Sequence, residues 1–196
     1  MILEALGEHA VRFAIPAGID RAALLARLRA VDGALDAVVT ETHAMVRFAG
    51  APPSVEVPAL LAGLDRVGQA AREHVIEVVY DGPDLDEVAA LTGLDRDQVI
   101  ALHAGAIYRV SFVGFLPGFA YLRGLDPRLA AVSRAAPPRT RVEPGSVAIA
   151  GGFTGVYPFA SPGGWRLLGR APSFHPLEGE HARLAVGDQV RFARIG

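Results

Sequence analysis

The sequence contains no cysteine, no lysine and no asparagine, so all 19 of its basic residues are arginine. Without cysteine the chain has no disulfide, no thiolate nucleophile and no cysteine-bound metal. Without lysine it has no Schiff-base lysine, no biotinyl-lysine and no Walker A lysine. These absences exclude several common catalytic chemistries for this chain, and any redox step would depend on a cofactor.

Strong charge of one sign and long apolar runs are also missing. The 196 residues are 51% hydrophobic and 20% charged with a net charge of −2, which is enough apolar material for a folded core. This balance provides no basic footprint for nucleic acid or an anionic membrane. No run reaches the roughly 18 apolar residues of a membrane span, and residues 1–14 lack a signal-peptide pattern. We expect a cytoplasmic protein with no nucleic-acid partner and no membrane partner.

Glycine and proline divide the chain in two, with 13 in residues 1–104 and 23 in residues 105–196. This shift predicts two architectures. In the first part the apolar pattern predicts a helix capped by Asp20 and a second helix over residues 57–71. Strands are expected at residues 2–6, 10–15, 37–42, 44–48 and 75–80. The order ββαββαβ predicts a small α+β sandwich over residues 1–83.

The second part, residues 84–196, is expected to begin with two short helices. Acidic residues at 84–87 open the first helix, and Asp95 opens the second, which ends at His103. The acids at the start of the second helix disfavour DNA reading by this helix pair. Apolar segments of strand length then recur between turns, at residues 108–115, 147–150, 165–169 and 189–195. The pattern predicts an all-β barrel or sandwich, and the whole chain is expected to be α+β.

Four stretches rich in glycine and proline are candidate binding loops. Glycine allows a ligand to approach the backbone and proline fixes the loop, but tight turns of a β fold use the same residues. Gly151 and Gly152 follow an apolar strand, as phosphate-binding glycines do. No helix pattern follows them, so neither a Rossmann turn nor a P-loop is expected, whereas a nest of backbone amides needs no lysine. The four stretches are residues 114–122, 138–146, 151–158 and 161–170.

Arginines gather between residues 123 and 141, where Asp126 is the single acidic residue. The guanidinium fork suits a carboxylate or a phosphate, so this interval is a candidate site for an anionic ligand or an acidic partner. The alternative is a solvated loop with scattered charges. The residues are Arg123, Arg128, Arg134, Arg139 and Arg141.

Individual catalytic residues are harder to assign. His103 ends a predicted helix, where it either caps and packs or faces a site in the β domain for acid–base work. Ser146 and Ser161 have no base identifiable nearby, and neither Gly-x-Ser-x-Gly nor His-Glu-x-x-His occurs. His175 and His181 lack the spacing of metal ligands. We therefore expect no metal site in this chain.

Five ordered motifs carry a family resemblance. They are the run from His103 to Tyr108, Gly-Phe-x-Pro-Gly-Phe-x-Tyr-Leu at 114–122, Pro-Gly-Ser at 144–146, Thr-Gly-x-Tyr-Pro at 154–158 and Ser-Pro-Gly-Gly-Trp at 161–165. Together they resemble the family that contains the B subunit of prokaryotic 5-oxoprolinase, also called allophanate hydrolase subunit 1 or the KipI family. With the ββαββαβ start, the resemblance covers essentially the whole chain.

The resemblance implies a small N-terminal α+β domain followed by a cyclophilin-like β barrel, a description of fold that does not imply prolyl isomerase activity. It implies one component, inactive alone, of an ATP-dependent hydrolase that converts 5-oxo-L-proline to L-glutamate together with a larger C subunit and an A subunit. ATP, with Mg, would be bound by this chain or by its partner, or shared between them. Relatives imply two alternatives, namely a urea or allophanate module and an inhibitor of a sensor histidine kinase.

The resemblance also suggests roles for individual residues. Arg139 and Arg141 are candidates for holding the substrate carboxylate or a phosphate, and His103 and Tyr121 for proton transfer or orientation. Phe153 departs from the family, which commonly has Gln there. Since Phe neither donates nor accepts a hydrogen bond, a different specificity is expected if this position touches substrate. The remaining candidates for substrate or nucleotide binding are Ser146, Gly151, Gly152, Thr154 and Tyr157.

Overall fold

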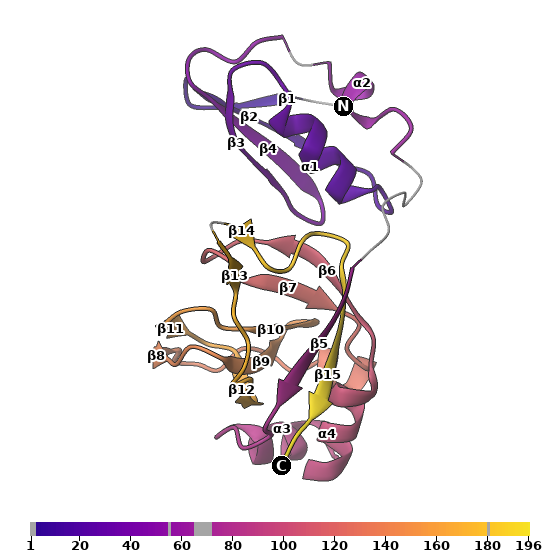
Figure 1. Cartoon of the computed structure of the whole chain (residues 1–196), viewed down its shortest axis with the longest axis vertical. Helices are drawn as coiled ribbons and strands as arrows, with labels where there is room; N and C mark the ends of the chain where they lie inside the picture. Colours follow the sequence, from indigo (N-terminus) through magenta and orange to yellow (C-terminus); the bar gives the residue numbers. More distant parts are fainter. Residues whose placement is uncertain (1–2, 55, 65–71, 180) are drawn as a thin grey trace. The chain divides into compact units, whose positions relative to one another are not determined.

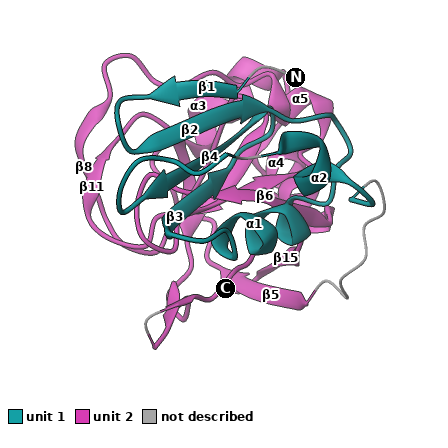
Figure 2. Cartoon of the chain, turned by 90° about the horizontal axis from the view of Figure 1, so that it is seen from above, with its two compact units in different colours: residues 1–70 teal, residues 71–196 magenta. Residues whose placement is uncertain are grey.

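The computed structural model describes residues 3–54, 56–64, 72–179 and 181–196, which belong to two compact units, residues 1–70 and 71–196 (Figure 2). The division differs from the predicted boundary after residue 83. The reason is β5 (Glu73–Val78), which pairs in parallel along its whole length with β15 (Gln189–Arg194) of the second unit. The apolar pattern located this strand near its observed position, but the pattern carries no information about its partner.

The first unit is a four-stranded antiparallel sheet with one principal helix, and its strand order is β1-β2-β4-β3. The Asp20 carboxylate accepts the backbone N–H of Ala23 at 3.0 Å, so the predicted N-cap of α1 is confirmed. The elements are β1 (Leu3–Leu6), β2 (Ala10–Ala14), α1 (Arg21–Arg29), β3 (Ala34–Val39), β4 (His43–Phe48) and α2 (Val57–Leu61).

Packing against the sheet holds α1 in place. Its Leu24 and Leu28 are fully buried in one cluster with Phe13 and Val46 of the strands. Complete burial of such a side chain contributes about 1.5–3 kcal/mol. The second predicted helix is shorter than expected, because α2 ends at Leu61 and Gly63 follows in a left-handed conformation. The rest of that prediction, at 65–71, lies outside the described residues.

The second unit is built on a seven-stranded sheet with the order β12-β9-β10-β7-β6-β15-β5 (Figure 1). All neighbouring strands are antiparallel except β15 and β5. Its further strands are β6 (Tyr108–Val113), β7 (Ala120–Arg123), β9 (Ser146–Ala150), β10 (Phe153–Val156) and β12 (Arg166–Arg170). Two small sheets accompany it, β8 (Arg139–Val142) with β11 (Ser161–Gly163) and β13 (Leu177–Glu178) with β14 (His181–Ala182).

The seven-stranded sheet is nearly closed into a barrel by a short seam. Val79, just beyond β5, exchanges two backbone hydrogen bonds of 2.9 Å with Arg170 of β12. The seam depends on glycine, because a Cβ atom on Gly169 would lie 2.2 Å from the Val79 carbonyl oxygen. A Cβ on Gly82 would lie 2.3 Å from the carbonyl oxygen of Leu167. Only residues without a side chain allow this approach of two backbones.

Among its described residues, the second unit also contains three helices, which are α3 (Leu85–Thr92), α4 (Arg96–Gly105) and α5 (Pro127–Ala130). The predicted helix pair is confirmed. Gly93 ends α3 in a left-handed conformation, and Asp95 forms a capping box with Gln98 at the start of α4. Figure 1 shows α3 and α4 at the end of the barrel where β15 finishes.

The mixed α/β composition and the barrel-like sheet agree with the predicted fold class. The finer descriptions, an N-terminal sandwich and a cyclophilin-like barrel, remain predictions. Within the described ranges, no helix has the length and apolar character needed to cross a membrane.

Candidate functional site

One group of predicted residues lies deep in the barrel core, around the fully buried ring of His103. Its Nδ1 atom is 2.8 Å from the Tyr80 hydroxyl, and its Nε2 atom is 2.8 Å from Oγ1 of Thr154. The Thr154 hydroxyl donates its one proton to the carbonyl oxygen of Ala148 at 3.0 Å. Oγ1 must therefore accept from Nε2–H, and Nδ1 accepts from the Tyr80 O–H.

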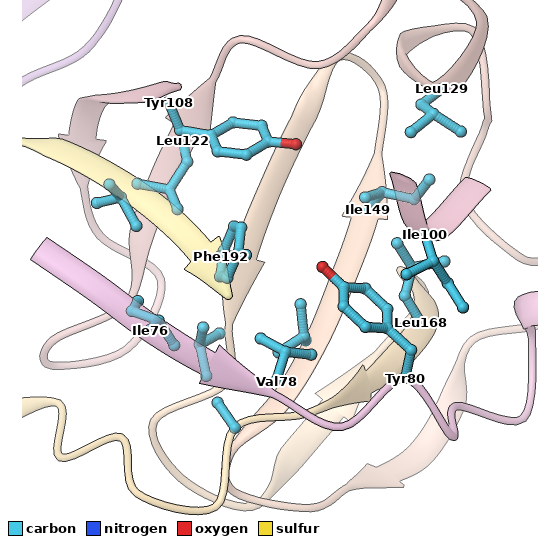
Figure 3. Close-up of a cluster of buried hydrophobic side chains, with 14 of the residues drawn as sticks. Ile76, Val78, Tyr80, Ile100, Tyr108, Leu122, Leu129, Ile149, Leu168 and Phe192 are labelled. Carbon is cyan, nitrogen blue, oxygen red and sulfur yellow. The ribbon is translucent and has the colours of Figure 1, made fainter. Parts of the chain in front are cut away.

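This network satisfies His103 without solvent or ligand. Burial lowers the pKa of His103 from 6.5 to about 3, so the ring is neutral, and it stacks on Phe192 with 4.6 Å between ring centroids. The Tyr108 hydroxyl donates to the carbonyl oxygen of His103 at 2.8 Å. Figure 3 shows the hydroxyls of Tyr80 and Tyr108 turned into this core. Of the two roles left open for His103, packing fits this geometry and acid–base work does not.

The two arginines proposed from the resemblance already have carboxylate partners. Arg139 donates from Nη2 to Oδ1 of Asp84 at 2.5 Å, and the other oxygen of this buried carboxylate accepts the Leu167 N–H at 2.7 Å. Arg139 thus neutralises a buried charge at the start of α3. Arg141 pairs with Glu143 at 2.7 Å, with both side chains exposed. Neither guanidinium lines the pocket described below.

Three further predicted residues have structural roles in the hairpin of β9 and β10. Gly151 and Gly152 both have positive φ angles, 54° and 85°, and form its two-residue turn between the paired residues Ala150 and Phe153. Such turns require left-handed backbone at both positions, so the turn interpretation accounts for both glycines. Ser146 is buried at the start of β9.

Phe153, the departure from the family pattern, lies in an aromatic cluster beside the pocket and does not line it. The guanidinium of Arg123 lies 4.4 Å from the centroid of its ring, and the Tyr121 ring meets it edge-on at 5.6 Å. The residue therefore contacts Tyr121, which does line the pocket.

The remaining two candidates, Tyr121 and Tyr157, lie together in an aromatic pocket with a volume of about 210 Å³. Phe119 is in edge-to-face contact with Trp165 at 5.3 Å and with Tyr157 at 5.4 Å between centroids. Tyr121 meets Trp165 in the same way at 5.5 Å. The lining residues come from all four glycine- and proline-rich stretches and from the arginine-rich interval, and they are Phe115, Phe119, Tyr121, Arg134, Pro138, Tyr157, Pro162, Gly163, Gly164 and Trp165.

Arg134 is the cation of this aromatic pocket. Its side chain is exposed, and in the part of the chain that the structure describes it forms no ion pair, unlike Arg128, Arg139 and Arg141. Burial raises the pKa of Tyr121 and Tyr157, and the nearby Arg134 cation partly opposes this rise. The sequence singled out the arginine-rich interval, but it could not separate Arg134 from Arg139, because the partner of Arg139 is 55 positions away.

Phe115 lies on the rim of the pocket in a strained conformation. Its φ angle is 75°, a left-handed value that costs a non-glycine residue about 1–2 kcal/mol. The side chain is 60% exposed and contacts Phe119 edge-on at 5.6 Å. Backbone strain of this kind concentrates at ligand sites. The motif at 114–122 located this loop, whereas the strain has no sequence signal.

The structure places the chain among mixed α/β proteins with a barrel-like sheet. The chain belongs to the family described as carboxyltransferase domain, subdomain C and D, whose model matches residues 1–183. Curated relatives named as the B subunit of 5-oxoprolinase are similar to it. The Bacillus subtilis (strain 168) protein is 47% identical over 116 residues, which is 58% of this chain and 48% of the relative. The Escherichia coli O157:H7 protein is 49% identical over 122 residues, 60% of this chain and 56% of the relative. The chain therefore spans about half the length of the curated relatives it matches.

Solved structures share the fold. TTHA0988 superposes with a TM-score of 0.80 at 37% identity, over 95% of this chain and 40% of that protein. The Pyrococcus horikoshii protein PH0987 gives a TM-score of 0.58 at 33% identity, over 99% of this chain and 97% of that protein. The K. lactis urea amidolyase gives a TM-score of 0.70 at 18% identity, over 98% of this chain and 15% of that enzyme, a likeness of fold alone.

Proposed function

We propose that this chain is the B-type subunit of an ATP-dependent 5-oxoprolinase, a hydrolase that converts 5-oxo-L-proline to L-glutamate. The observation that carries the proposal is the identity of 42–49% to three relatives that bear the name of the 5-oxoprolinase B subunit. The aromatic pocket adds support, since it is small and contains a cation, Arg134, that has no ion pair among the described residues.

The proposed reaction explains why ATP is needed. Amide resonance stabilises the lactam, so its carbonyl carbon is a poor electrophile towards water. Transfer of the γ-phosphoryl group of ATP to the lactam oxygen would make this carbon electrophilic. Two water molecules then complete the hydrolysis, one opening the ring and one releasing phosphate, and the products are glutamate, ADP and phosphate.

The aromatic pocket does not by itself fit ATP with Mg, because none of its lining side chains is a carboxylate that could hold the ion. The pocket, at about 210 Å³, is also below the roughly 300–1,000 Å³ of sites for drug-sized ligands. The proposal therefore assigns the nucleotide to a partner or to a shared interface. This chain would be inactive alone and would act in the cytoplasm with a larger C subunit and an A subunit.

A urea or allophanate module is the second candidate, favoured by the fold likeness to the K. lactis urea amidolyase. At 18% identity this likeness concerns the fold alone and does not identify a substrate. Inhibition of a sensor histidine kinase stays a prediction from the resemblance.

The test is ADP release by this chain reconstituted with the A and C subunits, with and without 5-oxo-L-proline. We expect stimulation by 5-oxo-L-proline that disappears when this chain is omitted. An intact, folded complex that releases no additional ADP would overturn the proposal. Parallel reactions with urea and allophanate would then test the second candidate.

A further inference from the structure

The aromatic pocket combines apolar walls, the Arg134 cation and phenolic hydroxyls within about 210 Å³. We propose that it binds a small, flat ring that carries a carboxylate, with Arg134 as the anion-binding residue. In the context of the proposed function, on which the identity of the ligand rests, this ring is the five-membered lactam of 5-oxoproline. Neither Arg139 nor Arg141 contacts the ligand in this arrangement.

The walls suit a flat ring. Phe119, Tyr121 and Trp165 meet one another edge to face, with centroid separations of 5.0–5.5 Å and interplanar angles of 72–79°. Each ring is fixed by two others, so the walls are pre-formed, and a flat ligand can take up the same edge or face contacts. An open-chain dicarboxylate such as glutamate would bury a second charge against these apolar walls, which is costly.

The cation suits a carboxylate. Its neighbours in the interval are occupied, since Arg128 pairs with Asp126 at 2.9 Å and Arg139 pairs with Asp84. Arg134, by contrast, forms no ion pair within the described ranges, and it lines the pocket together with two tyrosines. A free guanidinium offers two parallel N–H donors, the geometry that a carboxylate accepts.

The hydroxyl of Tyr121 suits the lactam. In the described part of the chain it has no hydrogen-bonding partner, and it remains protonated near neutral pH because burial raises its pKa. Its O–H can therefore donate to a carbonyl oxygen of the ligand. Arg134 and Tyr121 together provide one contact for the carboxylate and one for the lactam oxygen.

The rim of the pocket is held in place. Gly118, which follows Phe115 in the same turn, is closely packed, because a Cβ there would lie 2.8 Å from the carbonyl oxygen of Pro176. The Gly114 N–H donates to the Phe119 carbonyl at 3.0 Å and closes the turn. The strained Phe115 side chain is thus held against Phe119, which keeps the pocket formed without ligand.

Trp165 provides the measurement, since it is the single tryptophan of the chain and lines the pocket. We would titrate the full 196-residue chain with 5-oxo-L-proline and with its neutral carboxamide, and follow tryptophan emission. A saturable change is expected with the acid, and binding at least tenfold weaker with the carboxamide. Arg134→Gln should weaken binding of the acid at least tenfold. The matched control Arg128→Gln, in the same interval but paired outside the pocket, should bind as the parent does.

Absence of a saturable change, or equal affinity of the parent and Arg134→Gln, would overturn the inference. Its failure is distinguishable from failure of the proposed function. If the reconstituted complex hydrolyses 5-oxo-L-proline equally well with Arg134→Gln, the proposed role of the pocket is wrong and the proposed function stands. Conversely, the chain could bind the acid through Arg134 while the intact complex shows no ADP release stimulated by 5-oxo-L-proline. In that case the carboxylate pocket stands and the proposed function is wrong.

Discussion

The Nε2–H of His103 donates to Oγ1 of Thr154 over 2.8 Å and joins the last turn of α4 to β10. Both residues are completely buried. The Thr154 hydroxyl continues the chain of hydrogen bonds to the Ala148 carbonyl on β9. A helix and two strands of the barrel are therefore connected by one polar path through an apolar core.

Removing the hydroxyl of Thr154 should destabilise the barrel. In Thr154→Val the Nε2–H of His103 loses its acceptor and the Ala148 carbonyl loses a donor, which together should cost about 2–4 kcal/mol. Urea denaturation measures the free energy of unfolding. Thr154→Ser is the matched control, because it keeps the hydroxyl and loses one methyl group, worth about 1 kcal/mol. Equal stability of the two variants would show that this path does not support the fold.

The buried His103 predicts acid sensitivity. Burial lowers its pKa in the folded protein from 6.5 to about 3, so between these values the unfolded chain binds a proton that the native chain does not. The free energy of unfolding should therefore decrease as the pH falls from about 6.5 towards 3, by up to about 1.4 kcal/mol per pH unit from this group. Above pH 6.5 its contribution to stability is fully present.

NMR of the ¹⁵N-labelled imidazole isolates His103 from the carboxylates that titrate in the same range. The ring should stay neutral with the proton on Nε2 at about pH 5, because burial keeps its pKa well below this value and Nδ1 accepts from Tyr80. A ring that becomes protonated near pH 6.5 in the folded protein would contradict this prediction.

Sequence patterns predict local elements such as helix starts, but they do not predict features that depend on contacts between residues far apart in the chain. The Asp20 cap and the start of a helix at Asp95 depend on residues within a few positions of one another, so the sequence predicts them. For Gly151 and Gly152 the sequence leaves a turn and a binding loop open, and the structure shows a turn. The boundary of the second unit is not predicted, because β5 belongs to a sheet whose strand β15 lies more than a hundred positions away.

The candidate site shows the same limit. The resemblance singles out Tyr121 and Tyr157, and both lie in motifs dense in glycine and proline, which is typical of binding loops as well as turns. Arg139 was favoured over Arg134 because nothing local shows that Asp84 neutralises it. His103 had the residue type of a catalytic group, and only the fold shows that its ring is enclosed.

Arg139 should matter for stability more than for catalysis. Arg139→Ala leaves the Asp84 carboxylate, which is 4% exposed, without its cation, and we expect a loss of about 1–3 kcal/mol in the free energy of unfolding. The KM of the reconstituted complex should change less than with Arg134→Gln. Arg141→Ala is the control, since its exposed pair with Glu143 should contribute no measurable stability. A large rise in KM for Arg139→Ala with an unchanged free energy of unfolding would show that Arg139 acts in substrate binding and not in stability.

The glycine seam should tolerate no side chain. In Gly169→Ala the new methyl group would meet the Val79 carbonyl at 2.2 Å, and we expect a cost of about 3 kcal/mol or more. Amide hydrogen exchange at Val79 and Arg170 should accelerate, which reports opening of the seam itself. Gly105→Ala is the matched control, because nothing lies within 4 Å of its added methyl group. Similar stability of the two variants would show that the barrel closes without the seam.

The parallel pairing of β5 with β15 sets an order for folding during synthesis. Arg72, at the entry to β5, donates its backbone N–H to Asp188, at the entry to β15, across 116 positions of chain. At a synthesis rate of about 5–20 residues per second, β5 waits roughly 6–23 s for the strand that completes its pairing. The strands of the first unit, in contrast, find all their partners within residues 3–48. During synthesis the strands of the first unit can therefore pair while β5 still has an unpaired edge. Unpaired strand edges promote aggregation, which chaperones prevent.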